Sequence, residues 1–209
     1  MNTIAYLKER YGCGVPIFLK DIRIGGKSKT AIKQALYRAN KNGEIQKEAN
    51  GLYFFPRDDM FSSGIYFDDY LRIKYICDDR AGPCAELFNT VGYYSGLTFL
   101  NMFGLSEQVP AVIEITTNNT ASKKREIEIN GRRAILRKAK TKITYQNHKT
   151  LQFLDMIALL SKEEILASKE KIFSYAKTLP PKDVTTYMGL YGTQTMKKLV
   201  ETGLLYVVS

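Results

Sequence analysis

The stretch KSKTAIKQALYRANKNGEIQKEANGLYFF, from Lys27 to Phe55, decides the fold of the N-terminal part of the chain. In its first half, apolar side chains recur on one helical face, at Ile32, Ala35, Leu36 and Ala39. This spacing predicts a helix from about Lys27 to Lys41, with Ser28 as its N-cap and Asn42-Gly43 as its end.

The second half of the same stretch predicts a β-hairpin. Two short strand-like runs, Glu44–Lys47 and Leu52–Phe55, flank Ala49-Asn50-Gly51. Asn-Gly is typical of a tight turn, because both residues tolerate the positive φ angles that such turns need.

Two further helices are expected before Lys27. Asn2–Arg10 carries apolar residues at helical spacing, with Asn2 or Thr3 as N-cap, and Pro16 opens a second short helix that ends near Gly25-Gly26. Three helices followed by a hairpin are the order of a winged helix-turn-helix domain, which we place at residues 1–58. Such a domain lays its third helix in the major groove of DNA and its wing near the backbone.

Side chains that hold phosphates or hydrogen-bond base edges gather on this helix and wing. We expect DNA to contact Lys27, Ser28, Lys29, Thr30, Lys33, Gln34, Tyr37, Arg38, Lys41, Lys47 and Tyr53. The alternative is a solvated helix face that uses lysine for solubility.

The positive charge of the chain is concentrated in two blocks. The 209 residues carry a formal charge of +10. Residues 1–60 hold eleven Lys/Arg against six Asp/Glu, and residues 121–150 hold ten against two. Blocks of this kind suit a polyanion, because each neutralised phosphate releases counterions.

Beyond a polar connection at Pro56–Ser63, we expect an α+β domain at residues 64–209. A short helix at Gly96–Phe103, with Ser95 as N-cap, precedes strands at Ala111–Thr117, Arg125–Ile129 and Arg133–Lys138. These strands predict a small antiparallel sheet. Helices then follow to the C-terminus, at Lys149–Leu160, from a capping box at Ser161 toward Lys177, at Asp183–Leu190 and at Thr193–Thr202.

The second basic block falls on the predicted strands. Its members are Lys123, Lys124, Arg125, Arg132, Arg133, Arg137, Lys138 and Lys140. Three uses remain open for this surface: protection of a sheet edge, a second DNA contact, or a docking surface.

Sequence motifs of common enzymes are absent. Gly25-Gly26-Lys27-Ser28 imitates the end of a phosphate-binding loop but lacks the first glycine, and one histidine, His148, gives little basis for a hydrolase. The three cysteines lack zinc-site spacing. We therefore expect no catalysis, metal or cofactor, and an odd cysteine count without a signal peptide or membrane span favours the cytoplasm. The enzyme alternative is a DNA-targeted, metal-dependent nuclease that uses Asp58-Asp59, Asp68-Asp69 or Asp78-Asp79.

The segment YSGLTFLNMFGLSEQVP, from Tyr94 to Pro110, resembles the AbiEi family of antitoxins from bacterial type IV toxin–antitoxin (abortive infection) systems. The matching features are Ser95-Gly96, a short helix, Gly104-Leu105-Ser106 and Gln108-Val109-Pro110 before a strand and a basic β region. The N-terminal winged helix matches in position.

This resemblance implies a phage-defence antitoxin that represses its own operon by binding inverted promoter repeats. It further implies that the C-terminal domain counteracts a nucleotidyltransferase-like toxin without a stable complex. A monomer or weak dimer would assemble on the double-stranded promoter DNA. The runner-up is a winged-helix transcription regulator whose C-terminal domain senses a ligand.

Overall fold

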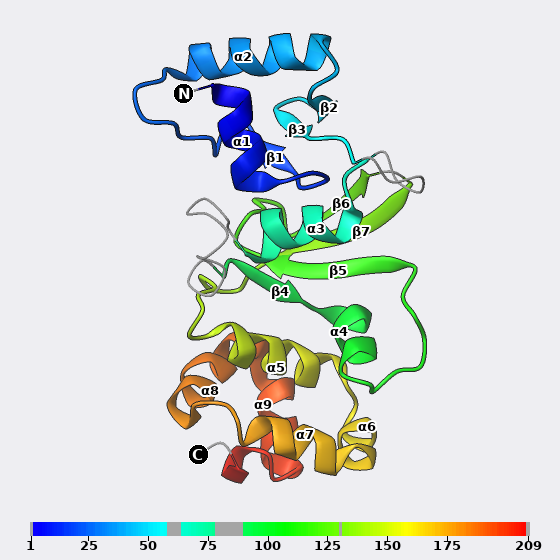
Figure 1. Cartoon of the computed structure of the whole chain (residues 1–209). Helices are drawn as coiled ribbons and strands as arrows, with labels where there is room; N and C mark the ends of the chain where they lie inside the picture. Colours follow the sequence, from blue (N-terminus) through cyan, green and yellow to red (C-terminus); the bar gives the residue numbers. More distant parts are fainter. Residues whose placement is uncertain (1, 58–63, 78–89, 130, 208–209) are drawn as a thin grey trace. The chain divides into compact units, whose positions relative to one another are not determined.

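A computed structural model describes residues 2–57, 64–77, 90–129 and 131–207 (Figure 1). The chain is a mixed α+β protein that divides into two compact units. Among the described residues, 2–57 and 64–74 belong to the first unit, and 75–77, 90–129 and 131–207 belong to the second. The expected domain boundary falls on residues 58–63, which lie outside the described part of the chain.

The first unit contains two long helices, a small sheet and a short third helix. In chain order these are α1 (Thr3–Tyr11), β1 (Ile17–Phe18), α2 (Lys29–Lys41), β2 (Gln46–Ala49), β3 (Leu52–Phe54) and α3 (Phe67–Leu71). A π-helical turn at Arg72–Ile76 follows α3 and runs across the division between the units.

Helix α1 begins and ends as the sequence predicts. The Asn2 Oδ1 atom accepts a hydrogen bond from the Ile4 N–H at 2.9 Å, which satisfies one of the unpaired donors at the helix start. Gly12 follows the helix at φ 72°, a left-handed conformation that favours glycine.

The helix expected from Pro16 is absent, and this prediction is wrong. Ile17 and Phe18 instead form β1, which pairs antiparallel with β3 through Ile17–Tyr53 and Phe18–Leu52. The next residue continues the contact, since the Leu19 N–H donates to the Gly51 carbonyl oxygen at 2.8 Å. The apolar run that suggested a helix face therefore extends the hairpin into a three-stranded sheet of order β1-β3-β2.

The hairpin itself is confirmed. Strands β2 and β3 pair antiparallel around the Asn50-Gly51 turn, with a register shift between Lys47 and Ala49. Gly51 has φ 76°, as a tight turn requires. The sheet and both long helices bury one core, made of Leu7, Ile17, Ile22, Ile24, Ile32, Leu36, Ala39, Ile45, Tyr53 and Phe55.

The second unit combines a four-stranded sheet with a set of C-terminal helices. Its elements are β4 (Gly92–Tyr94), α4 (Gly96–Met102), β5 (Val112–Thr117), β6 (Lys124–Ile129), β7 (Arg132–Lys138), α5 (His148–Leu159), α6 (Lys162–Ala167), α7 (Lys169–Ala176), α8 (Pro181–Tyr187) and α9 (Gly192–Glu201). Figure 1 shows α5–α9 gathered on one side of this sheet.

The sheet is mixed, which corrects the expectation of an antiparallel one. Its order is β4-β5-β7-β6, and β5 runs parallel to β7, whereas the other pairs are antiparallel. Ala134 and Leu136 on β7 are fully buried, whereas most of β6 is exposed. In the β6–β7 hairpin, β7 therefore lies inside the sheet and β6 forms one of its edges.

The helices follow the predicted order with one difference. The capping box at Ser161 and Glu164 is present, but the single helix expected after it is divided into α6 and α7 at Ser168. Ser168 leaves the helical region at φ −110° and ψ 26°. Helix α5 anchors this layer, with Leu151, Phe153, Leu154 and Ile157 almost fully buried. Within the described residues, no helix has the length and apolar character needed to cross a membrane.

Candidate nucleic-acid interface

Helix α2 is amphipathic, and its burial fixes which side chains face outward. Ile32, Leu36 and Ala39 lie in the core of the first unit. The helix start is capped as predicted, because the Ser28 Oγ atom accepts a hydrogen bond from the Ala31 N–H at 3.2 Å. The packed face and the cap together hold the opposite face in one orientation.

The outward face of α2 is basic and lacks any carboxylate. Its exposed predicted residues are Lys29, Thr30, Lys33, Gln34, Tyr37, Arg38 and Lys41. Lys29 and Lys33 stand four residues apart, and Arg38 and Lys41 stand three apart, so like charges are neighbours along the helix. Such pairs destabilise an isolated helix by about 0.2–0.5 kcal/mol each. A bound polyanion would remove this repulsion.

Tyr37 is the large apolar side chain of this face. It is 66% exposed, between Lys33 and Lys41 in the same helical row. A tyrosine in this position can pack its ring against sugar or backbone while its hydroxyl stays available for a hydrogen bond.

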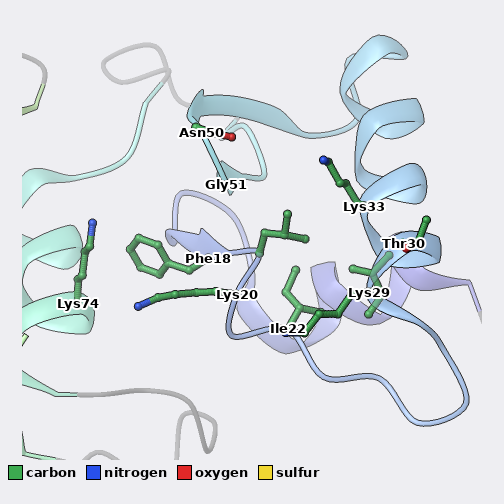
Figure 2. A pocket seen from close by; sticks show the side chains of 11 residues that line it. Phe18, Lys20, Ile22, Lys29, Thr30, Lys33, Asn50, Gly51 and Lys74 are labelled. Carbon is green, nitrogen blue, oxygen red and sulfur yellow. The ribbon is translucent and has the colours of Figure 1, made fainter.

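A groove of about 560 Å³ runs along one side of α2, and Figure 2 shows the residues that line it. Helix α2 contributes Lys29, Thr30 and Lys33, and the hairpin turn contributes Asn50 and Gly51. Among the residues that the structure describes, no acidic one lines the groove. The helix and the hairpin turn thus border one positively charged hollow.

Two lysines of this groove were not predicted. Lys20 lies in the segment that was expected to be helical, and Lys74 lies far along the chain. The Lys74 Nζ atom donates to the Tyr70 hydroxyl at 2.6 Å and lies 5.3 Å from the centre of the Phe18 ring. The local sequence pattern could not predict that Lys74 lines the groove, because only the packing of α3 and the following turn brings it there.

A second, more open hollow of about 540 Å³ lies on the other side of α2. Lys27, Ser28, Gln34 and Arg38 line it, and its described lining again has no acidic residue. The Lys27 Nζ atom donates to the Thr3 Oγ1 atom at 2.6 Å, which ties the α2 start to the α1 start. Lys27 therefore has a structural contact besides its predicted role.

The two predicted wing residues have different surroundings. Lys47 is exposed on β2, whereas Tyr53 is only 6% exposed and belongs to the core. All three residues of β3 are buried, although successive side chains of a strand point to opposite faces. Both faces of β3 are therefore covered, and the expectation that Tyr53 contacts DNA is corrected.

The second basic surface belongs to the other unit, and all eight of its predicted side chains are exposed. It differs from α2 in having acidic partners. Arg133 lies 3.3 Å from the Glu126 carboxylate, and the Arg137 Nη2 atom donates to the Glu114 Oε2 atom at 2.6 Å. Two of its eight cations are therefore paired with carboxylates.

The segment from Tyr94 to Pro110 runs from the end of β4 through α4 toward β5. Ser95 stands at the N-cap position of α4, but its side chain makes no capping hydrogen bond. Gly104 follows the helix at φ 70°. The segment has the expected helix and turn, while the expected use of the Ser95 hydroxyl as a cap is wrong.

The remaining candidates for chemistry do not converge. Asp58-Asp59, Asp78-Asp79 and Cys84 lie outside the described residues. Asp68 and Asp69 lie on α3, and the described part of the chain holds no group of three His, Cys, Asp or Glu residues suited to a metal ion. Burial lowers the pKa of His148, whose Nδ1 atom lies 2.6 Å from the Tyr145 carbonyl oxygen.

Comparison of the chain with models of known protein families gives no match, and comparison with curated proteins gives none either. The family resemblance therefore depends on the residues of the Tyr94–Pro110 segment and on the order of the N-terminal elements.

Proposed function

We propose that the chain binds double-stranded DNA through its first unit, which acts as a winged helix-turn-helix lacking a helix between β1 and α2. The carboxylate-free outward face of α2 supports this proposal most strongly. Helix α2 lies in the major groove, where Gln34 and Arg38 read base edges. The lysines beside it hold phosphates of the flanking backbone.

The resemblance of Tyr94–Pro110 to AbiEi antitoxins supports a more specific role. The protein is a cytoplasmic transcriptional autorepressor that binds inverted repeats in the promoter of its own toxin–antitoxin operon. It counteracts a nucleotidyltransferase-like toxin and performs no catalysis of its own. DNA recognition then belongs to the first unit and toxin control to the second.

A gel-shift titration with the protein's own promoter fragment tests the DNA-binding step. Lys33→Glu combined with Arg38→Glu replaces two cations on α2 with two anions, so repulsion from phosphates replaces attraction. We expect affinity to fall by about 100-fold or more. Circular dichroism should show an unchanged helix content, because both side chains are exposed.

The matched control is Lys177→Glu combined with Lys182→Glu, at two exposed positions of the second unit. It changes the net charge equally but leaves α2 intact. Its affinity should stay within about threefold of the native value, because salt screens charges that lie far from the bound DNA. Equal losses in the two variants, or no loss in the α2 variant, would refute recognition by this helix.

Growth rescue tests the antitoxin step separately. A nucleotidyltransferase-like toxin encoded next to this gene should arrest growth, and co-expression of this chain should restore it. The α2 double variant should still rescue when both genes are placed under foreign promoters, since neutralisation is assigned to the second unit. Failure of the native chain to rescue would leave a DNA-binding regulator without antitoxin activity.

A further inference from the structure

The second unit contains a pocket of about 430 Å³ whose walls carry both charges. It lies where β4 passes into α4, beside β5, the end of β7 and α5. Ligand pockets for small molecules usually measure about 300–1,000 Å³ and combine apolar walls with a few placed polar groups. The Ser95-Gly96 pair lines this pocket.

One side of the pocket is cationic. Lys123, Lys138 and Lys140 line it, and all three are exposed. The side chains of Lys123 and Lys138 make no hydrogen bond or ion pair within the described residues. These two ammonium groups therefore keep their full donor capacity for a bound anion.

Carboxylates line another part of the same pocket. Asp155 is largely buried and accepts hydrogen bonds at Oδ2 from the Tyr93 hydroxyl at 2.8 Å and the Thr116 hydroxyl at 3.3 Å. Glu114 accepts two bonds from Arg137 at Oε2 and a longer one, of 3.4 Å, from the Leu97 N–H at Oε1. A carboxylate offers about four lone-pair sites, so both groups can accept further bonds from ligand hydroxyls.

Ser95 supplies a polar atom that nothing in the described chain satisfies. The residue is 3% exposed, and its Oγ atom is buried without a hydrogen-bond partner. Leaving such a hydroxyl unpaired is unfavourable, so a structure that retains it needs a reason. A ligand atom in the pocket would provide the missing partner.

Gly96 keeps the pocket wall free of a side chain. It has φ 58°, and a Cβ atom there would lie 2.5 Å from the Glu114 carboxylate. Leu97 and Leu159 also line the pocket and are 48% and 51% exposed. Large apolar side chains left exposed beside a polar hollow are typical of a binding site.

We propose that this pocket binds a sugar phosphate, either free or as part of a mononucleotide. The phosphate lies against Lys123 and Lys138, and sugar hydroxyls donate to Asp155 and Glu114 while one accepts from Ser95. Leu97 and Leu159 cover the least polar part of the ligand. This inference goes beyond DNA binding and toxin control, and it does not depend on either of them.

Isothermal titration of the full chain tests the ligand class with four probes: ribose 5-phosphate, AMP, inorganic phosphate and adenosine. Ribose 5-phosphate and AMP should bind at least about tenfold more tightly than phosphate or adenosine, because each of the latter lacks half of the required groups. Tighter binding of AMP than of ribose 5-phosphate would identify a nucleotide, and equal binding a free sugar phosphate. No binding, or equal binding of inorganic phosphate, would overturn the proposal.

Lys138→Ala tests the site itself, with Lys142→Ala as its control. Both residues are exposed and close in sequence, but only Lys138 lines the pocket. We expect Lys138→Ala to weaken ribose 5-phosphate binding by about tenfold and Lys142→Ala to leave it unchanged. Equal effects would place the ligand elsewhere.

Ser95→Ala separates binding from stability. It removes a hydroxyl without a partner, so the melting temperature should stay constant or rise while ribose 5-phosphate binding weakens by several-fold. A lower melting temperature with unchanged binding would give Ser95 a structural role and overturn its assignment.

A binding assay with a single-stranded oligonucleotide provides the last check. If Lys138→Ala weakens oligonucleotide binding but not ribose 5-phosphate binding, the lysines serve nucleic acid and the proposal is wrong.

Discussion

The two basic regions of this protein differ in where their acidic residues lie. Helix α2 and the described lining of the hollows on both of its sides contain none, whereas β6 carries Glu126 and Glu128 after its two basic residues, and Arg137 of β7 bonds to Glu114. An uninterrupted positive surface suits the repeated charge of a nucleic-acid backbone. A mixed surface around a pocket suits a compact ligand that brings both an anion and hydrogen-bond donors. The net charge of the two basic regions would not by itself distinguish a nucleic-acid surface from a small-molecule pocket.

The largest expected effect is a loss of stability when the core packing beneath the α2 surface is removed. Leu36 is fully buried beneath it, so Leu36→Ala should lower the free energy of unfolding by about 2–5 kcal/mol. Hydrogen exchange should locate the loss of protection in residues 2–57. The reciprocal control, Leu154→Ala in the second unit, should instead expose amides in residues 131–207. Identical exchange patterns in the two variants would show that the units do not unfold separately.

The sequence predicted the first unit wherever a local pattern was sufficient. The α2 periodicity, its Ser28 cap and the Asn50-Gly51 turn all needed only neighbouring residues, and all are present. The segment from Pro16 was misread because an apolar run of this length fits a helix face and a paired strand equally well. Only pairing with β3 decides between them.

In the second unit as well, local patterns could not predict contacts between distant strands. The hairpin of β6 and β7 could be predicted from its turn, but the insertion of β7 beside β5 depends on contacts between distant residues. The candidate sites follow this rule too. The α2 surface is contiguous in sequence, whereas the pocket brings together residues from α4, β5, β7 and α5. The sequence pointed to Ser95-Gly96 and to the basic residues of the second block, but no local pattern places Glu114 and Asp155 beside them.

Reversing charge on the second basic surface sharpens the contrast. Lys124→Glu with Arg125→Glu alters the net charge as much as the α2 double variant does. Because Glu126 and Glu128 follow these two residues on β6 and lower the local positive potential, promoter affinity in the gel shift should fall by at most about tenfold, against about 100-fold for α2. A loss as large as that of the α2 variant would make the second surface a true DNA contact.

A smaller effect is expected at the β2–β3 hairpin, which we propose to be the wing. Lys47 is exposed on β2, so Lys47→Ala should weaken promoter binding by several-fold and reduce the slope of log affinity against log salt by about 1. Lys8→Ala, at an exposed position on α1, should leave the slope unchanged. Tyr53→Phe should also have no effect, because that side chain lies in the core. An unchanged slope in Lys47→Ala would remove the wing from the interface.

The smallest expected effect is a change in how stability depends on pH, and it belongs to the pocket. Burial raises the pKa of Asp155 above its ordinary value of 3.8 despite hydrogen bonds from Tyr93 and Thr116. The folded state therefore holds this proton more tightly than the unfolded chain does. The resulting stabilisation is complete below the ordinary pKa and is lost as pH rises through the folded pKa.

Asp155→Asn removes this titration while keeping an oxygen that can accept from the Tyr93 hydroxyl. Denaturant unfolding at a series of pH values should show the native chain losing stability relative to this variant as pH rises from about 4. Glu170→Gln, at an exposed position on α7, should give a curve parallel to that of the native chain. If the Asp155→Asn curve is parallel as well, the carboxyl group is not desolvated. The pocket would then be an open, hydrated surface, and the contrast with α2 would rest on the positions of acidic residues alone.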